Sequence, residues 1–197
     1  LLGPKGKRLH IILLDTRWAR SKLKKYNFIS NLFKRQFIGM GPYRPSQDRE
    51  ATILGKDQWS WLEKEFRKKA DLRIIGTSIQ ALANFTGWEA WANIPHERKR
   101  LLNLIQSYSE TPTFLISGDV HRGEMAQVQL NESISILEVT SSGLTHTTSK
   151  IPPNKNRIYK PILKPHYGFI NIDWGSSITF DLRGKNGKIY HKHRVDL

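Results

Sequence analysis

Three apolar runs constrain the fold most: "LHIILLD" (9–15), "DLRIIGTSIQ" (71–80) and "TPTFLISGDVH" (111–121). The first is rich in leucine and isoleucine and lacks alternation of polar and apolar residues, which is typical of a strand covered on both faces. Two segments with helical periodicity, 54–70 and 95–110, separate the runs. The order strand, helix, strand, helix, strand favours right-handed crossovers and a largely parallel sheet.

The two helical segments show which side chains should face the core. In residues 54–70 apolar residues recur at spacings of three and four, and lysines and glutamates occupy the other face. Residues 95–110 have Pro95 near the expected first turn. The side chains expected to point inward are Trp59, Leu62, Phe66, Leu101, Leu102 and Ile105.

Beyond residue 124 the apolar pattern changes to a period of two, which indicates antiparallel strands in 133–140, 168–174 and 177–195. A glycine and asparagine turn at 184–187 divides the last of these segments. Residues 16–50 and 150–167 are basic and interrupted by proline or glycine, and we expect surface segments without regular structure there. The chain is therefore expected to be an α/β protein with a mixed sheet and antiparallel strands toward the C-terminus.

The composition limits the possible chemistry. The sequence has no cysteine, which excludes disulfides and thiolate ligands, so a bound metal must use oxygen and imidazole donors. No run approaches the roughly 18 apolar residues that a membrane span needs. The sequence also begins without methionine and leads directly into a strand, so we expect a fragment or processed product. The absence of cysteine fits both reducing and oxidising cellular compartments.

The net charge of +15 raises an alternative function, a basic nucleic-acid-binding module without catalysis. Basic and aromatic residues are interleaved in "TRWARSKLKKYNF" (16–28) and "NRIYK" (156–160), as in surfaces that stack bases and contact phosphates. The excess charge lies toward the ends, because residues 101–150 hold two basic and five acidic residues. That central part is better suited to a cation than to a phosphate backbone.

The central part contains "SGDVH" (117–121), at the end of an apolar run. Ligands of open α/β sheets gather at the carboxyl ends of strands. Gly118 permits a tight turn, and the spacing of Asp119 and His121 can direct a carboxylate and an imidazole to one point, a sensible pair for a cation. A hydrogen-bonded turn without a ligand is the alternative interpretation.

Six motifs in order give the chain a specific resemblance. Together they resemble the carboxyl-terminal half of alkaline phosphatase D (PhoD-like) proteins, in the calcineurin-like metallophosphoesterase superfamily, over about residues 5–147. The motifs are "LLDTRWAR", "GPYRPSQDREATILGKDQWSWLE", "DLRIIGTSIQ", "GWEAWANIPHERKRLLNLI", "FLISGDVHRGEM" and "LEVTSSGLTH". The superfamily's last ligand motif is usually Gly-His-x-His, to which "GDVH" is similar.

The resemblance implies a sheet sandwich flanked by helices, of which residues 1–197 would be the carboxyl-terminal portion of a single domain, with the N-terminal portion absent. It implies that Asp119 and His121 bind metal and that the protein hydrolyses phosphate mono- or diesters. The metal would be Ca, Fe, Mn or Zn. Because ligands of the first half are missing, we expect little or no activity from this chain alone. Relatives are commonly exported, which suggests a periplasmic or extracellular location.

Several other residues have both a functional and a structural interpretation. Arg17, just past the first strand, can bind a phosphoryl group, and an ion pair with Asp15 or another acid is the alternative. Glu124 can orient His121, and an ordinary surface or loop-stabilising role is the alternative. Further candidates, each with a structural alternative, are Ser78 and Gln80 for substrate or water, Trp88, Trp91 and His96 for an aromatic wall, Ser141, Ser142 and His146 for a nucleophile, and His191 and His193 for zinc.

Overall fold

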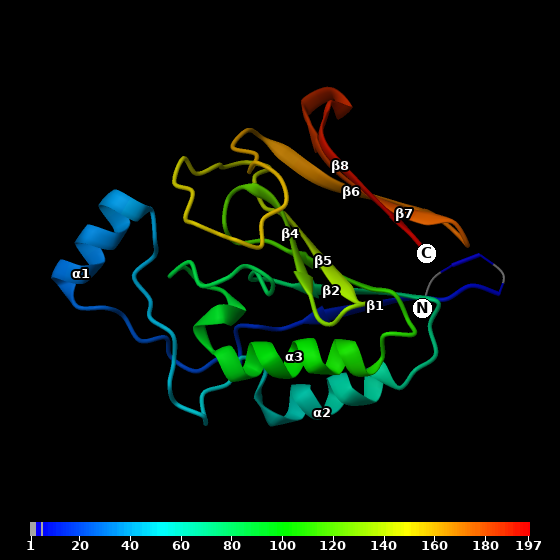
Figure 1. The fold of residues 1–197 in the computed structure, drawn as a ribbon, viewed down its shortest axis with the longest axis horizontal. Helices are drawn as coiled ribbons and strands as arrows, with labels where there is room; N and C mark the ends of the chain where they lie inside the picture. Colours follow the sequence, from blue (N-terminus) through cyan, green and yellow to red (C-terminus); the bar gives the residue numbers. More distant parts are fainter. Residues whose placement is uncertain (1–2, 5) are drawn as a thin grey trace.

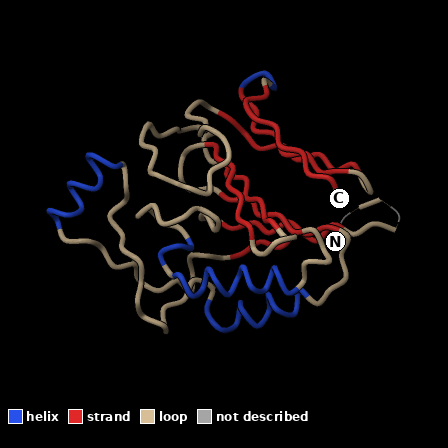
Figure 2. The backbone as a smooth tube through the Cα atoms, in the orientation of Figure 1, coloured by secondary structure: helices blue, strands red, loops and turns tan. Residues whose placement is uncertain are grey.

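The computed structural model describes residues 3–4 and 6–197, which form three layers (Figures 1 and 2). Helices α2 (Gly55–Phe66) and α3 (Pro95–Ser107) cover one face of a five-stranded sheet. A three-stranded sheet lies against the other face. No helix in the described part of the chain is long and apolar enough to cross a membrane.

The five-stranded sheet is mixed, with the order β1-β2-β3-β5-β4. The three apolar runs form its parallel strands β1 (Leu9–Leu14), β2 (Leu72–Thr77) and β3 (Thr113–Ser117), as predicted. Strand β5 (Ser135–Ser141) was expected to be antiparallel, but it pairs parallel to β3 and antiparallel only to β4 (Gly123–Gln129). Strand β4 was not predicted, because buried Glu124 interrupts its apolar pattern.

The second sheet is antiparallel throughout, as its period of two predicted. It contains β6 (His166–Asp173), β7 (Ser177–Gly184) and β8 (Ile189–Asp196) in that order. The predicted turn between β7 and β8 is present at Lys185–Gly187. Asn186 and Gly187 adopt left-handed φ values of 61° and 75° there, a conformation that asparagine and glycine tolerate.

Apolar side chains fill both interfaces between the layers. The helix side of the sheet buries Ile12, Ile75 and Leu115 against the two helices. The predicted inward residues Trp59, Leu62, Phe66, Leu101 and Ile105 are buried there, and Leu102 is half-buried against the same core. The core between the sheets contains Leu72, Phe114, Met125, Leu137, Val139, Ile178, Phe180 and Leu182.

Strand β1 departs from the prediction that both of its faces are covered. Its helix side is buried, but Ile11 and Leu13 on the opposite face are 43% and 71% exposed. The core between the sheets is built on strands β2 to β5. An apolar cleft of about 530 Å³ therefore lies beside the end of β1, lined by Leu13 and by Tyr167 and Phe169 of β6.

The two segments expected to be irregular each differ from that expectation. Residues 16–50 contain the short helix α1 (Phe28–Phe33), capped by Asn27, and a π-helical turn η1 (Lys34–Ile38). None of the α1 residues is buried, so no buried face marks this helix in the sequence. Residues 150–167 lack strands before β6, as expected, but Asn154 and Ile162 are buried rather than on the surface.

Candidate functional site

The "SGDVH" segment forms a tight loop at the carboxyl end of β3. Asp119 and His121 both have left-handed backbone conformations, with φ of 71° and 53°. Such conformations of non-glycine residues cost on the order of 1–3 kcal/mol each and persist only where the surroundings determine them. Two of them within three residues mark this loop as a candidate functional site.

Hydrogen bonds of the main chain hold the loop at both ends. The N–H of Val120 donates to the Gly118 carbonyl at 2.9 Å, which closes the turn. The N–H of Thr148 donates to the His121 carbonyl, also at 2.9 Å. The loop is thereby joined to the segment that follows β5.

Arg17 reaches this loop from the end of β1. Its Nη2 donates to Asp119 Oδ1 at 2.8 Å, and its Nη1 forms an ion pair with Glu89. Asp15 has a different task, since its carboxylate accepts hydrogen bonds from the N–H groups of Arg17 and Trp18 at 2.8 and 3.0 Å. The structure thus brings Arg17 and Asp119 together across 102 residues of sequence.

Glu89 is a member of this cluster that the sequence analysis missed. It pairs with Arg20 at 2.9 Å as well as with Arg17. Burial would raise the pKa of Glu89, but the two arginines outweigh burial and lower the pKa below its ordinary value. Burial also opposes the charge of Arg17, yet Glu89 and Asp119 raise the pKa of its guanidinium. The lowered pKa of Glu89 and the raised pKa of Arg17 both favour the charged forms that make this ion pair.

A pocket of about 190 Å³ opens beside the loop, lined by Trp88, Asp119, Val120, His121, Arg122, Thr148 and Lys150. The indole N–H of Trp88 donates to the Gly39 carbonyl at 3.0 Å, which fixes the ring at the edge of the pocket. Trp88 therefore lies at the rim of the same pocket as Asp119 and His121.

His146 also approaches the loop. Its ring lies edge-on to the His121 ring, with 5.0 Å between centroids. Ser142 donates to the Arg122 carbonyl at 3.4 Å. Within the described part of the chain, no hydrogen bond joins Ser141 or Ser142 to His146, so the arrangement needed for a serine nucleophile is not formed.

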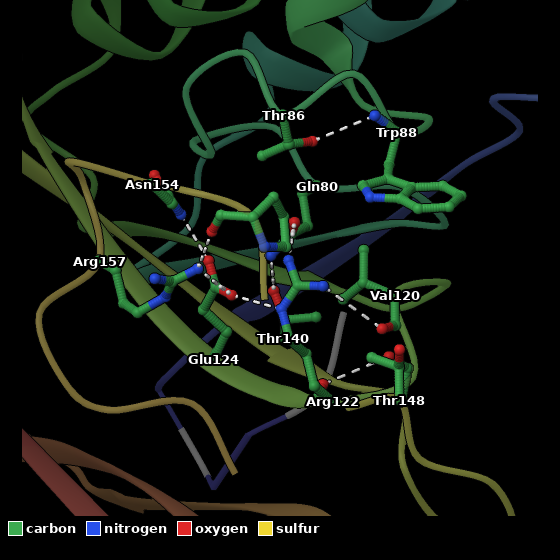
Figure 3. A network of polar contacts seen from close by, with 12 residues as sticks. Gln80, Thr86, Trp88, Val120, Arg122, Glu124, Thr140, Thr148, Asn154 and Arg157 are labelled. Atoms are coloured by element: carbon green, nitrogen blue, oxygen red, sulfur yellow. Dashed lines mark hydrogen bonds and ion pairs between the residues drawn. The ribbon is translucent and has the colours of Figure 1, made fainter. Parts of the chain in front are cut away.

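Ser78 and Gln80, which follow β2, form hydrogen bonds with other side chains of the protein. Gln80 is buried, donates to Thr140 Oγ1 at 3.0 Å and accepts from Arg122 Nη2 at 3.4 Å (Figure 3). Ser78 shares a short hydrogen bond with Thr16. These contacts satisfy Gln80 and Ser78 without a substrate.

The remaining candidates have structural contacts. Trp91 is buried and donates to Thr77 Oγ1 at 2.9 Å, which agrees with a core role. His96 Nε2 contacts the Ala51 carbonyl at 2.7 Å. His193 Nδ1 lies 3.0 Å from the Tyr159 hydroxyl, and the His191 ring stacks on Tyr159. These two histidines anchor the segment before β6.

The donors available to a cation are Asp119 and His121. A carboxylate and an imidazole suit Mn, Fe or Zn, and Asp119 keeps its second oxygen, because Arg17 contacts Oδ1. Within residues 3–4 and 6–197, no group of three or more His, Cys, Asp or Glu side chains is arranged to hold a metal ion. The residues present therefore fit part of a metal site.

The fold is similar to two solved phosphatase structures. PhoD matches over 97% of this chain and 39% of its own, with a TM-score of 0.69 and 16% identity. The purple acid phosphatase PPD1 from yellow lupin (Lupinus luteus) seeds matches over 72% of this chain and 28% of its own, with a TM-score of 0.59 and 14% identity. At these identities the likeness shows the fold alone.

The sequence itself matches a family model. No curated protein sequence is similar enough to count as a match. The family model for PhoD-like phosphatases, however, matches residues 4–185, which is most of the chain. The protein therefore belongs to the PhoD-like phosphatase family.

Proposed function

We propose that this chain is the carboxyl-terminal portion of a metal-dependent phosphoester hydrolase domain, in which Asp119 and His121 bind a cation. The observation that carries the proposal is the pair of left-handed residues at the end of β3, in a chain whose family hydrolyses phosphoric esters. The chain spans 39% of the length of PhoD, so the remaining ligands would come from outside it.

Each of four side chains at this site, Asp119, His121, Arg17 and Trp88, would have a separate role in the reaction. Asp119 and His121 would hold a cation, and such a cation would supply Lewis acidity toward the phosphoryl group and toward water. Arg17 would offset charge on the phosphoryl oxygens with those guanidinium hydrogens that its contacts with Asp119 and Glu89 leave over. Trp88 would shield one side of the pocket from water.

Removal of either donor tests the proposal. We expect Asp119→Ala and His121→Ala each to weaken Mn²⁺ binding by at least about tenfold, since even the partners behind metal ligands contribute about 10–100-fold. Isothermal titration calorimetry on the 197-residue chain measures the affinity. Equal Mn²⁺ binding by both variants and the unchanged chain would remove the metal-site assignment.

A second measurement separates activity from binding. With two donors, we expect the chain alone to hydrolyse a chromogenic phosphodiester slowly or not at all. A longer protein that carries this chain and the rest of the domain should hydrolyse it, lose activity with chelator and recover with metal. Activity that is unaffected by chelator would contradict metal dependence.

Nucleic-acid binding remains the alternative, favoured by the exposed basic segment around α1. Phe28, Phe33 and Phe37 are exposed there, and no acidic residue lies between positions 16 and 47. The second basic segment is engaged internally, because Arg157 pairs with Glu124. DNA or RNA binding that falls steeply with salt and ignores chelator would support the alternative.

A further inference from the structure

Glu124 is a fully buried carboxylate in β4, three residues after His121. It is 1% exposed, and charged groups in such surroundings require partners. Its Oε2 accepts from Arg122 Nε at 2.7 Å and from Arg157 Nη2 at 3.2 Å (Figure 3). Asn154 Nδ2 donates to Oε1. Both oxygens are therefore occupied, and neither contacts His121.

Arg122 connects this carboxylate to the loop. The guanidinium is buried, and besides Glu124 it contacts the Val120 carbonyl at 3.5 Å and Gln80 Oε1 at 3.4 Å. Val120 lies between the two candidate ligands. Because the fork of an arginine is rigid, fixing Nε on Glu124 also fixes the nitrogen atoms that face Val120 and Gln80.

The loop needs such support from outside itself. Both of its candidate ligands have left-handed backbones, and among the described residues the main-chain hydrogen bonds of this loop join Val120 to Gly118 and His121 to Thr148. The guanidinium of Arg122 is the side chain that contacts the carbonyl between these two bonds.

We propose that Glu124, acting through Arg122, is a positioning residue that holds Asp119 and His121 in their left-handed conformations and so raises the cation affinity of the loop. This inference rests on the proposed function, which it deepens. It assigns to Arg157 and Asn154 the supporting task of fixing the carboxylate from the opposite side.

The test compares Glu124→Gln with a matched control, Asp181→Asn. Asp181 is 2% exposed and pairs with Arg183, two residues away, at 2.6 Å in β7, outside the lining of the metal-site pocket. We expect Glu124→Gln to lower Mn²⁺ affinity about 10–100-fold. Asp181→Asn should stay within about twofold, even if both variants lose similar stability.

Arg122→Lys is the second variant, because Glu124→Gln leaves buried Arg122 and half-buried Arg157 without their carboxylate and can fail to fold. Arg122→Lys keeps the charge and removes the fork. We expect it to reproduce the Mn²⁺ loss. The double variant should lose no more Mn²⁺ affinity than the single variant that binds Mn²⁺ more weakly, because both substitutions remove the same Glu124–Arg122 contact.

A metal-free measurement keeps this inference separate from the proposed function. Amide hydrogen exchange of residues 118–122 should accelerate in Glu124→Gln or Arg122→Lys and not in Asp181→Asn. If the unchanged chain binds no Mn²⁺, the proposed function fails, and the exchange rates still decide whether Glu124 holds the loop. Unchanged exchange, or equal Mn²⁺ losses in Glu124→Gln and Asp181→Asn, would overturn the positioning role.

Discussion

At the scale of single residues, burial determines the behaviour of several ionisable groups. His10 on β1 faces the helices and contacts Glu65 Oε2 at 3.1 Å. Burial lowers the pKa of His10 below its ordinary value of 6.5, and the charge of Arg73 adds to this effect, whereas Glu65 opposes it. The folded protein therefore favours the neutral imidazole.

The lowered pKa of His10 predicts a pH dependence of stability. Between its folded pKa and 6.5 the unfolded chain binds the proton more tightly, so the stabilising contribution is present above 6.5 and is lost as the pH falls. Unfolding free energies measured with urea from pH 8 to pH 5.5 should decrease toward acid. His10→Gln should flatten this dependence, and an equally steep decrease in that variant would contradict the assignment.

At the scale of secondary structure, the start of α2 depends on α3. The N-cap residue Leu54 makes no side-chain hydrogen bond, and the Gly55 N–H donates to Thr52 Oγ1, which itself donates to Glu97 of α3. Glu97 also accepts hydrogen bonds from the N–H groups of Ile53 and Leu54 at 2.8 and 3.4 Å and from Trp59 Nε1 at 2.8 Å. Burial would raise the pKa of Glu97, but these hydrogen bonds outweigh burial and lower it.

We expect Glu97→Gln to reduce the free energy of unfolding by about 1.5–3 kcal/mol, the range for hydrogen bonds to a charged group. The control is Glu63→Gln, since the Glu63 pair with Arg100 is exposed and should contribute less than about 1 kcal/mol. Urea titrations at pH 7 compare the two. Because the pKa of Glu97 is lowered, its contribution should be lost as the pH falls below 4.5.

At the scale of the whole molecule, the described chain has an open sheet edge. Strand β1 is the first strand of its sheet, and Ile11 and Leu13 project from its uncovered face. Unpaired edges with exposed apolar side chains promote association between molecules.

Leu13→Lys should therefore reduce self-association of the 197-residue chain without unfolding it, because Leu13 is 71% exposed. Sedimentation velocity at several concentrations measures the association. Leu14→Lys is the opposite case, because buried Leu14 lies on the helix side and its replacement should destabilise the fold. Unchanged association in Leu13→Lys would show that another surface is responsible.

Elements with a strong local pattern could be predicted from the sequence. The spacing of Trp59, Leu62 and Phe66 predicted α2 and its buried face, and the apolar runs predicted β1 to β3. Strand β4 could not be predicted, because two of the three partners that satisfy Glu124 inside it, Asn154 and Arg157, lie about 30 residues later. Helix α1 was missed because it buries none of its side chains.

In the candidate site too, residues marked by the nearby sequence could be predicted, and a residue whose partners are distant in the sequence could not. The spacing of Asp119 and His121 within one loop was visible in the sequence, and so was the position of Arg17 at a strand end. Glu89 was not, because nothing near it in the sequence indicates its pairing with two arginines 69 and 72 residues away. Whether these residues bind metal and substrate stays a prediction.

The contacts of Glu124 with Arg122, Asn154 and Arg157 also limit how far the chain can be shortened without loss of the loop. Asp119 and His121 precede residue 122, but two of the three donors to Glu124 lie on Asn154 and Arg157. A protein truncated at residue 150 would keep both candidate ligands and still lose most of the support for their backbone. The minimal unit that preserves this loop therefore extends at least through Arg157, into a stretch that contains neither candidate ligand.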